Sequence, residues 1–296
     1  MVAKYMEEIK KEVINNSDWT EVIEPKTSLL QLGLKDVWRY RDLLFLFVRR
    51  DFVATYKQTI LGPLWHFIQP ILTTVMFVIL FGKIANIPTD GILAIPFYLS
   101  GITIWNYFVA CLNGTSNTFV GNAGIFGKVY FPRLVIPFSV IISNIIKLGI
   151  QFLLLLSVLI YYWFKLGQFY IGWSWFLIPV LIILSAGLGL GLGILISSLT
   201  TKYRDFTILI AFGIQLLMYA TPIAYPISYL KEKSKYAYLI NYNPISAIVE
   251  GFRWAIFKNN DFQISSLYYS FLWMAVTLFL GVIVFNKTEK KFMDTV

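Results

Sequence analysis

The sequence predicts an all-α integral membrane protein with six transmembrane helices. Of its 296 residues, 57% are apolar and only 14% are charged, and the apolar residues gather in six long runs with almost no charge. A soluble domain of this size has about 25% charged residues, so this chain has too few charges to cover a surface that faces water. The composition therefore excludes soluble enzymes and free nucleic-acid-binding proteins.

Each of the six runs is long enough to cross the hydrocarbon core as a helix, which takes about 20 residues. The third run is longer than one crossing needs and is interrupted by Lys147, so we expect it to tilt, bend at Pro137 or extend into the cytoplasm. The runs cover residues 64–82, 92–112, 134–164, 173–199, 206–224 and 264–285.

The positive charges indicate the orientation of these spans. With the N-terminus in the cytoplasm, 17 of the 25 Lys and Arg residues fall on the cytoplasmic side and seven outside, while Lys147 lies within the membrane. The positive-inside rule therefore places both termini in the cytoplasm, and an odd number of spans would put the three lysines of the tail outside. Anionic membrane lipids explain the net charge of +9, and no nucleic-acid partner is expected.

Four segments follow from this layout. Residues 1–35 carry charges throughout without a signal-peptide apolar core, and we expect a cytoplasmic segment there. Residues 36–60 form an amphipathic helix and its connection, 61–286 the six-span domain, and 287–296 a cytoplasmic tail.

The stretch 36–53 predicts an amphipathic helix that lies along the inner membrane surface. A surface anchor and a partner-docking role are equally open here. Arg41 is the exception, because it falls on the apolar arc and must snorkel or find a carboxylate. The arc consists of Val37, Trp38, Leu44, Phe45, Val48 and Phe52.

The second cytoplasmic connection, 113–133, ends in a short basic and aromatic sequence. Exposed apolar side chains between two cations indicate a docking patch, although such loops are more often simple interface anchors. The patch would consist of Lys128, Val129, Tyr130, Phe131, Pro132 and Arg133.

The largest outer segment, 225–263, is neither a simple loop nor a full span. It is rich in proline and ends in a short amphipathic stretch, 244–257, of the kind that dips into the membrane and returns. Glu250 and Arg253 stand three residues apart on one helical face. An exposed ion pair of little consequence and a gating pair are both open.

Polar and aromatic residues at helical spacing indicate a pathway for a hydroxyl-rich substrate. His66, Gln69 and Thr73 recur at i, i+3 and i+7 in the first span, as Phe212, Gln215 and Tyr219 do in the fifth. The alternative is helix packing with polar groups bonded to neighbouring helices. Packing also explains the alternating glycines 187, 189, 191 and 193 of the fourth span.

Several kinds of chemistry are absent from the sequence. A single cysteine, Cys111, and a single histidine, His66, exclude a disulfide framework and a His-rich metal site. No P-loop motif occurs, so ATP must be hydrolysed elsewhere if it drives this protein. The spans contain no carboxylate, which disfavours ion-coupled carriers, and Lys147 is the one clear intramembrane charge.

Several sequence blocks resemble type-2 ABC-transporter permeases that export polysaccharides, closest to the O-antigen (Wzm-type) and teichoic-acid export permeases. The likeness extends over nearly the whole chain from Asp36. The most specific block reads Tyr56-Lys57-Gln58-Thr59-Ile60-Leu61-Gly62-Pro63-Leu64-Trp65. The other blocks are Arg49-Arg50-Asp51, Gln69-Pro70, Phe81-Gly82-Lys83, Phe131-Pro132-Arg133 with Pro137, Tyr203-Arg204-Asp205, and Asn243-Pro244 with Glu250-Gly251-Phe252-Arg253.

The resemblance implies an assembly and a substrate. The permease would be a homodimer bound to two copies of a cytoplasmic ATPase that holds ATP and Mg, with no cofactor on this chain. The segment 122–133 would contain the coupling helix, 36–53 would be the interface helix, and 227–257 would close the outer mouth through Asn243, Glu250 and Arg253. The cargo would be a polyprenyl-pyrophosphate-linked glycan in a bacterial inner membrane. By electrostatics, Arg49, Arg50 and Lys57 would receive the pyrophosphate.

The leading hypothesis is therefore a permease that moves a lipid-linked polysaccharide outward from the cytoplasmic side. A drug or small-lipid ABC exporter is the first alternative, because such permeases share the six-span plan. A membrane-embedded polyprenyl-phosphate glycosyltransferase or an acyltransferase is the second, although such enzymes usually display acidic pairs or a catalytic histidine.

Overall fold

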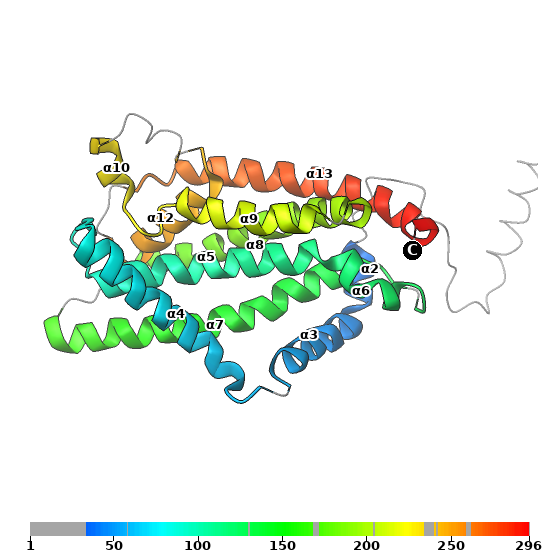
Figure 1. The fold of residues 1–296 in the computed structure, drawn as a ribbon, viewed down its shortest axis with the longest axis horizontal. Helices are drawn as coiled ribbons and strands as arrows, with labels where there is room; N and C mark the ends of the chain where they lie inside the picture. The colour runs from blue at the N-terminus through cyan, green and yellow to red at the C-terminus, as the bar shows by residue number, and fades with distance from the viewer. Residues whose placement is uncertain are drawn as a thin grey trace, which may run out of the picture. The chain divides into compact units, whose positions relative to one another are not determined.

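The computed structural model describes residues 34–57, 59–129, 131–167, 172–203, 205–233, 240, 242–258 and 262–295. The chain divides into Met1–Gln31 and Leu32–Val296, and all described residues belong to the second unit. Every regular element in the described part of that unit is helical (Figure 1). The all-α expectation is thus confirmed for these residues.

Five helical segments in the described residues are long and apolar enough to cross a membrane. They match the first, second, third, fourth and sixth predicted spans, so the chain is a multi-pass membrane protein. The segments are Gly62–Ile84, formed by η1 (Gly62–Leu64), α4 (Trp65–Phe77) and η2 (Val78–Ile84); α5 (Ala94–Ser116); α7 (Val135–Leu166); Trp173–Lys202, formed by η3 (Trp173–Phe176) and α8 (Leu177–Lys202); and Ser266–Glu289 of α13 (Ser266–Thr295).

The fifth predicted span forms a shorter helix, α9 (Phe206–Tyr219), of 14 residues. At 1.5 Å per residue it is about 21 Å long, less than the roughly 30 Å hydrocarbon core. The chain leaves the helix at Ala220 and enters a turn that contains Pro222. The count of six spans therefore stays a prediction.

Helix α8 packs between α5 and α13, and its glycines make both contacts possible. A Cβ atom at Gly189 would lie 2.8 Å from the Cβ of Cys111 on α5, and one at Gly191 would lie 2.6 Å from Oγ1 of Thr277 on α13. Because such distances leave no room for a methyl group, only glycine allows this approach. The predicted packing role of the glycine ladder is confirmed.

Helix α7, with 32 residues, is the longest helix in the described part of the chain, and it packs against α3, α4 and α5. Pro137 lies in the first turn of α7. The backbone N–H groups of a first turn have no partner within the helix, so a proline there costs no hydrogen bond and requires no bend. Figure 1 shows α4 crossing α7 obliquely.

The predicted amphipathic helix is divided at Tyr40 into α2 (Leu34–Arg39) and α3 (Arg41–Tyr56). Val37, Leu44 and Val48 of the predicted apolar arc are buried, whereas Trp38 and Phe45 are exposed. The break at Tyr40 changes the angular position of the residues after it, so one continuous arc no longer describes both pieces.

Short helices stand where the outer segment was expected to form them. Helix α10 (Ile227–Lys233) precedes residues 234–239, which lie outside the described residues, and α12 (Pro244–Phe257) follows. Helix α12 packs against α5, α8 and α13. Whether these helices re-enter the membrane stays a prediction. Helix α6 (Thr118–Phe126) occupies the connection between α5 and α7, and the cytoplasmic location of this connection stays a prediction.

Candidate functional site

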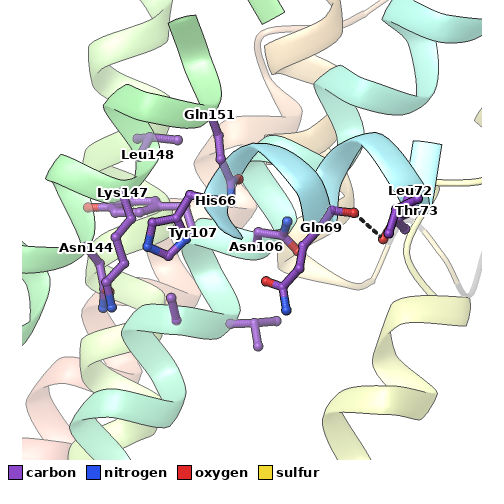
Figure 2. A pocket seen from close by; sticks show the side chains of 12 residues that line it. His66, Gln69, Leu72, Thr73, Asn106, Tyr107, Asn144, Lys147, Leu148 and Gln151 are labelled. Atoms are coloured by element: carbon purple, nitrogen blue, oxygen red, sulfur yellow. Dashed lines mark hydrogen bonds between the residues drawn. The ribbon is translucent and has the colours of Figure 1, made fainter. Parts of the chain in front are cut away.

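A polar cavity of about 580 Å³ lies between α4, α5 and α7, and its lining side chains point from three helices toward a common space (Figure 2). This volume falls within the roughly 300–1,000 Å³ usual for small-ligand sites. The lining residues are His66, Gln69, Leu72 and Thr73 of α4; Asn106, Tyr107, Val109 and Ala110 of α5; and Asn144, Lys147, Leu148 and Gln151 of α7.

Helical spacing explains why these residues meet. On α7, Asn144, Lys147 and Gln151 recur at i, i+3 and i+7 and share one helix face. His66, Gln69 and Thr73 repeat the same spacing on the face of α4 that meets this face of α7. On α4 the Thr73 hydroxyl donates to the Gln69 carbonyl oxygen at 2.9 Å, so this hydroxyl is held by its own helix (Figure 2).

Two polar atoms at the cavity are buried without a hydrogen-bond partner in the described part of the chain: Nε2 of His66 and the hydroxyl of Tyr107. The ring of Tyr56 stands edge-on to the His66 ring, with 5.6 Å between their centroids. Because buried polar atoms are nearly always bonded, these two mark a place where a partner is missing.

Lys147 is the one charged side chain among the lining residues that the structure describes, and it is half-buried. The nearest acidic influence is Asp51 of α3, whose carboxylate is already paired with Arg50 at 2.7 Å. The Lys147 side chain lines the polar cavity together with Asn144 and His66 (Figure 2).

Of the six predicted pathway residues, the structure brings three together. His66, Gln69 and Thr73 line the cavity. Phe212, Gln215 and Tyr219 lie exposed on α9 and do not line it. Their role in a pathway stays a prediction.

Four polar lining residues were not predicted from the sequence, although a signal existed for two of them. Asn144 and Gln151 flank the recognised Lys147 at helical spacing, as His66, Gln69 and Thr73 are spaced on α4. Asn106 and Tyr107 gave no such signal, because they are neighbours in sequence within an aromatic stretch of α5.

The predicted inner-entrance cations differ in their surroundings. Arg49 and Lys57 are exposed. Arg50 binds Asp51 at 2.7 Å, donates to Oδ1 of Asn122 at 3.4 Å and lies over the Phe47 ring at 4.6 Å. Their proposed contact with a pyrophosphate stays a prediction, and Arg50 is the least available of the three.

The predicted ATPase-docking patch is only partly exposed. Lys128 is exposed and Pro132 is half-buried, while Tyr130 lies outside the described residues. The expectation that Phe131 is exposed is wrong, because its side chain is only 5% exposed. Its ring packs against Phe47 and Phe126 at centroid distances of 5.6 and 5.7 Å, and this apolar cluster provides the reason for its burial.

Arg133, at the end of the patch, is bonded within the chain. Its Nη1 donates to the Glu289 carbonyl oxygen at 2.7 Å, and its Nε lies 3.8 Å from the Glu289 carboxylate. Burial lowers the pKa of the Arg133 guanidinium, and the Glu289 charge opposes that shift. The arginine thereby ties the loop before α7 to the last helix, α13.

The outer ion pair is buried rather than exposed. Arg253 is 0% exposed, and its Nη1 lies 3.1 Å from Oε1 of Glu250. The same nitrogen donates to the Pro222 carbonyl, Nη2 donates to the Ile223 carbonyl at 2.6 Å, and the guanidinium lies 3.7 Å from the Phe97 ring centroid. The expectation of an exposed pair of little consequence is therefore wrong. Burial lowers the pKa of the Arg253 guanidinium, and the Glu250 charge opposes that shift.

Asn243 caps the helix that holds this pair. Its Oδ1 accepts from the backbone N–H of Ile245 at 3.1 Å, and its Nδ2 donates to Oγ1 of Thr221 at 2.9 Å. Asn243 and Arg253 thus fasten both ends of α12 to the turn after α9. A gating role for the three residues stays a prediction.

Comparisons with known proteins agree with this architecture. The model of the ABC-2 type transporter family matches residues 42–257. The chain is 29% identical over 257 residues to the O-antigen export system permease protein RfbA of Klebsiella pneumoniae, a match that covers 86% of this chain and 94% of that protein. It is 26% identical over 227 residues to the protein of the same name from Myxococcus xanthus, covering 76% and 83%.

Proposed function

Because this chain belongs to the ABC-2 type transporter family, we propose that it is the permease subunit of an ATP-driven exporter of a lipid-linked polysaccharide. The chain moves its cargo from the cytoplasmic side across a bacterial inner membrane, with both termini in the cytoplasm. The names of the relatives, which are O-antigen export permeases matched over most of their length, support this choice of cargo.

The structural observation that favours this function is the chemistry of the cavity. Four carboxamides, from Gln69, Asn106, Asn144 and Gln151, line one space inside apolar helices. Carboxamides both donate and accept hydrogen bonds, which suits sugar hydroxyls. A drug site is expected to be mainly apolar, and a glycosyltransferase is expected to place acidic side chains at its reaction centre. The lining residues described here include neither Asp nor Glu.

The energy source lies on a partner. Without a nucleotide motif, the chain acts as a transport subunit, and ATP and Mg bind to a separate cytoplasmic ATPase. Two permeases and two ATPases form the complex. Lys128 and Val129 are the exposed residues that meet the ATPase, and Arg133 transmits the movement of this loop to α13 through Glu289.

Complementation of a deletion strain tests the function. The gene is deleted from its own organism, and wild-type permease is returned with either an active ATPase or one lacking its catalytic carboxylate. Surface polysaccharide should return only with the active ATPase, and lipid-linked glycan should accumulate inside without it. Normal surface polysaccharide in the deletion strain would exclude this cargo, and a change in drug sensitivity alone would favour the drug-exporter alternative.

Co-purification tests the docking surface. Lys128→Glu should reduce the amount of ATPase recovered with the permease, because it reverses an exposed charge at the proposed contact. Arg133→Glu should reduce it further, because the new carboxylate also repels Glu289. Lys202→Glu is the matched control, since this exposed lysine on the same side lies over Tyr203 at the end of α8. Equal recovery with all three variants would remove the patch from the interface.

A further inference from the structure

The cavity between α4, α5 and α7 contains a charge without a close counterion. Lys147 makes no hydrogen bond or ion pair within 4 Å to any residue that the structure describes. Asp51, the carboxylate that acts on it, is held by Arg50 through contacts of 2.7 and 2.8 Å. A lysine inside a membrane is costly unless an opposite charge or hydrogen-bonding groups compensate it. The site therefore favours an anion.

The groups around Lys147 are donors as well. Nε2 of His66 and the hydroxyl of Tyr107 are buried without a partner, and Lys147 acts electrostatically on His66. The amide groups of Asn106 and Asn144 add N–H donors, and none of the twelve lining residues brings a negative charge. This number of donors around one cation matches a phosphate, which offers several acceptor oxygens.

The rim of the cavity includes exposed apolar side chains. Leu72 of α4 lines the cavity and is 59% exposed, and Val109 and Ala110 of α5, which also line it, are partly exposed. In a membrane, exposed apolar residues of spanning helices contact acyl chains. A ligand with a polar head inside the cavity and a hydrocarbon chain along this rim satisfies both surfaces.

We propose that this cavity is a binding site for the phosphate-bearing headgroup of a membrane amphiphile, with Lys147 as its principal anion-binding residue and with His66, Tyr107 and the carboxamides as donors. The site lies within one permease chain. Two sources share this chemistry: a phospholipid of the bilayer, and the lipid pyrophosphate of the exported glycan. Only the second source rests on the proposed function.

Native mass spectrometry of the full-length purified chain tests the site. The probes are phosphatidylglycerol, undecaprenyl pyrophosphate, and a diacylglycerol with the same acyl chains but no phosphate. We expect a phosphate-bearing probe to be retained and diacylglycerol to be lost. Lys147→Gln should weaken that binding by about 10- to 100-fold, the usual value for a charge-assisted hydrogen bond. Lys147→Arg should retain most of it.

Lys165→Gln is the matched control, because it removes the same charge from the far end of α7, where Lys165 is exposed and lies over Tyr161. Asn106→Leu provides a second cavity variant if Lys147→Gln does not fold, as judged by size-exclusion elution. The site is supported when the cavity variants lose the lipid and Lys165→Gln keeps it. Equal binding by all variants, equal loss in all of them, or equal retention of diacylglycerol would overturn it.

The probes also separate the two sources and the two proposals. Binding of phosphatidylglycerol alone assigns the site to bilayer lipid, and binding of undecaprenyl pyrophosphate alone assigns it to the cargo. Lys147-dependent binding in a chain that fails to restore surface polysaccharide would leave the site standing and reject the proposed function. Restored polysaccharide without Lys147-dependent binding would reject the site and support the proposed function.

Discussion

Two polar regions lie within the apolar helices of this protein, and they differ in how their cations are bonded. At the outer end, both terminal nitrogens of Arg253 are bonded, to Glu250 and to the Pro222 and Ile223 carbonyls, and the side chain is fully buried. In the cavity, Lys147 lacks such bonds to described residues and faces open space. A buried cation that is bonded at both terminal nitrogens holds structure, whereas one without such bonds is available to a ligand.

The largest effect on stability is expected for Arg253→Gln. The change leaves the buried Glu250 without its counterion and removes a donor from each of two backbone carbonyls, so it should reduce the free energy of unfolding by about 3–5 kcal/mol. Equilibrium unfolding in mixed detergent micelles measures this. Lys258→Gln, at the exposed end of the same helix, is the control. A loss below about 1 kcal/mol for Arg253→Gln would show that Arg253 contributes no more to stability than is expected of Lys147.

Gly101→Ala tests how tightly the outer region is packed. The added methyl group would lie 2.6 Å from Nη2 of Arg253, which the Ile223 carbonyl holds in place, so a loss of about 1–3 kcal/mol is expected. Gly149→Ala on α7 should be neutral or should stabilise by up to about 1 kcal/mol, because nothing lies within 4 Å of its new methyl. Similar unfolding free energies for the two variants would show that the outer cluster yields easily.

Lys147→Met should separate stability from transport. Its free energy of unfolding should change by less than about 1 kcal/mol, or rise, because the variant removes a charge that the cavity leaves poorly compensated. Export, measured as surface polysaccharide per permease, should fall by about tenfold. A marked loss of stability would mean that Lys147 holds structure as Arg253 does, and the contrast between the regions would disappear.

The smallest effect on stability is expected on α9. Phe212→Ala and Tyr219→Ala should alter the free energy of unfolding by no more than about 0.5 kcal/mol, because these side chains are 58% and 64% exposed. If they line the pathway, export should slow while Leu153→Ala, an exposed position on α7, leaves it unchanged. Unaltered polysaccharide output would remove both aromatic residues from the pathway.

Hydropathy predicted most of the helices but not their limits. Runs of apolar residues identified five segments long enough to span, since a helix in lipid must satisfy its backbone internally and needs no distant partner. The same pattern gave 206–224 as a span, whereas the helix ends at Tyr219, where the turn containing Pro222 supplies carbonyls to Arg253. Likewise, hydropathy did not predict the break at Tyr40.

Half of the polar residues that line the candidate site were predicted from the sequence. The spacing of His66, Gln69 and Thr73 indicated a polar face on α4, because side chains three and four residues apart share a face of any helix. It gave no information on which helices that face meets. Phe131 shows the opposite error: its neighbours Lys128 and Arg133 suggested exposure, yet Phe47, from a helix more than eighty residues earlier, covers it.

By itself, the sequence determined that this is a helical membrane protein, where five of its long apolar helices lie, and which polar residues repeat along each helix. These properties depend on local composition and spacing. Only the tertiary structure decided that Arg253 is buried and bonded while Lys147 faces a cavity, because that outcome depends on which helices pack together. The two cations thus acquired different surroundings through contacts between segments far apart in the chain.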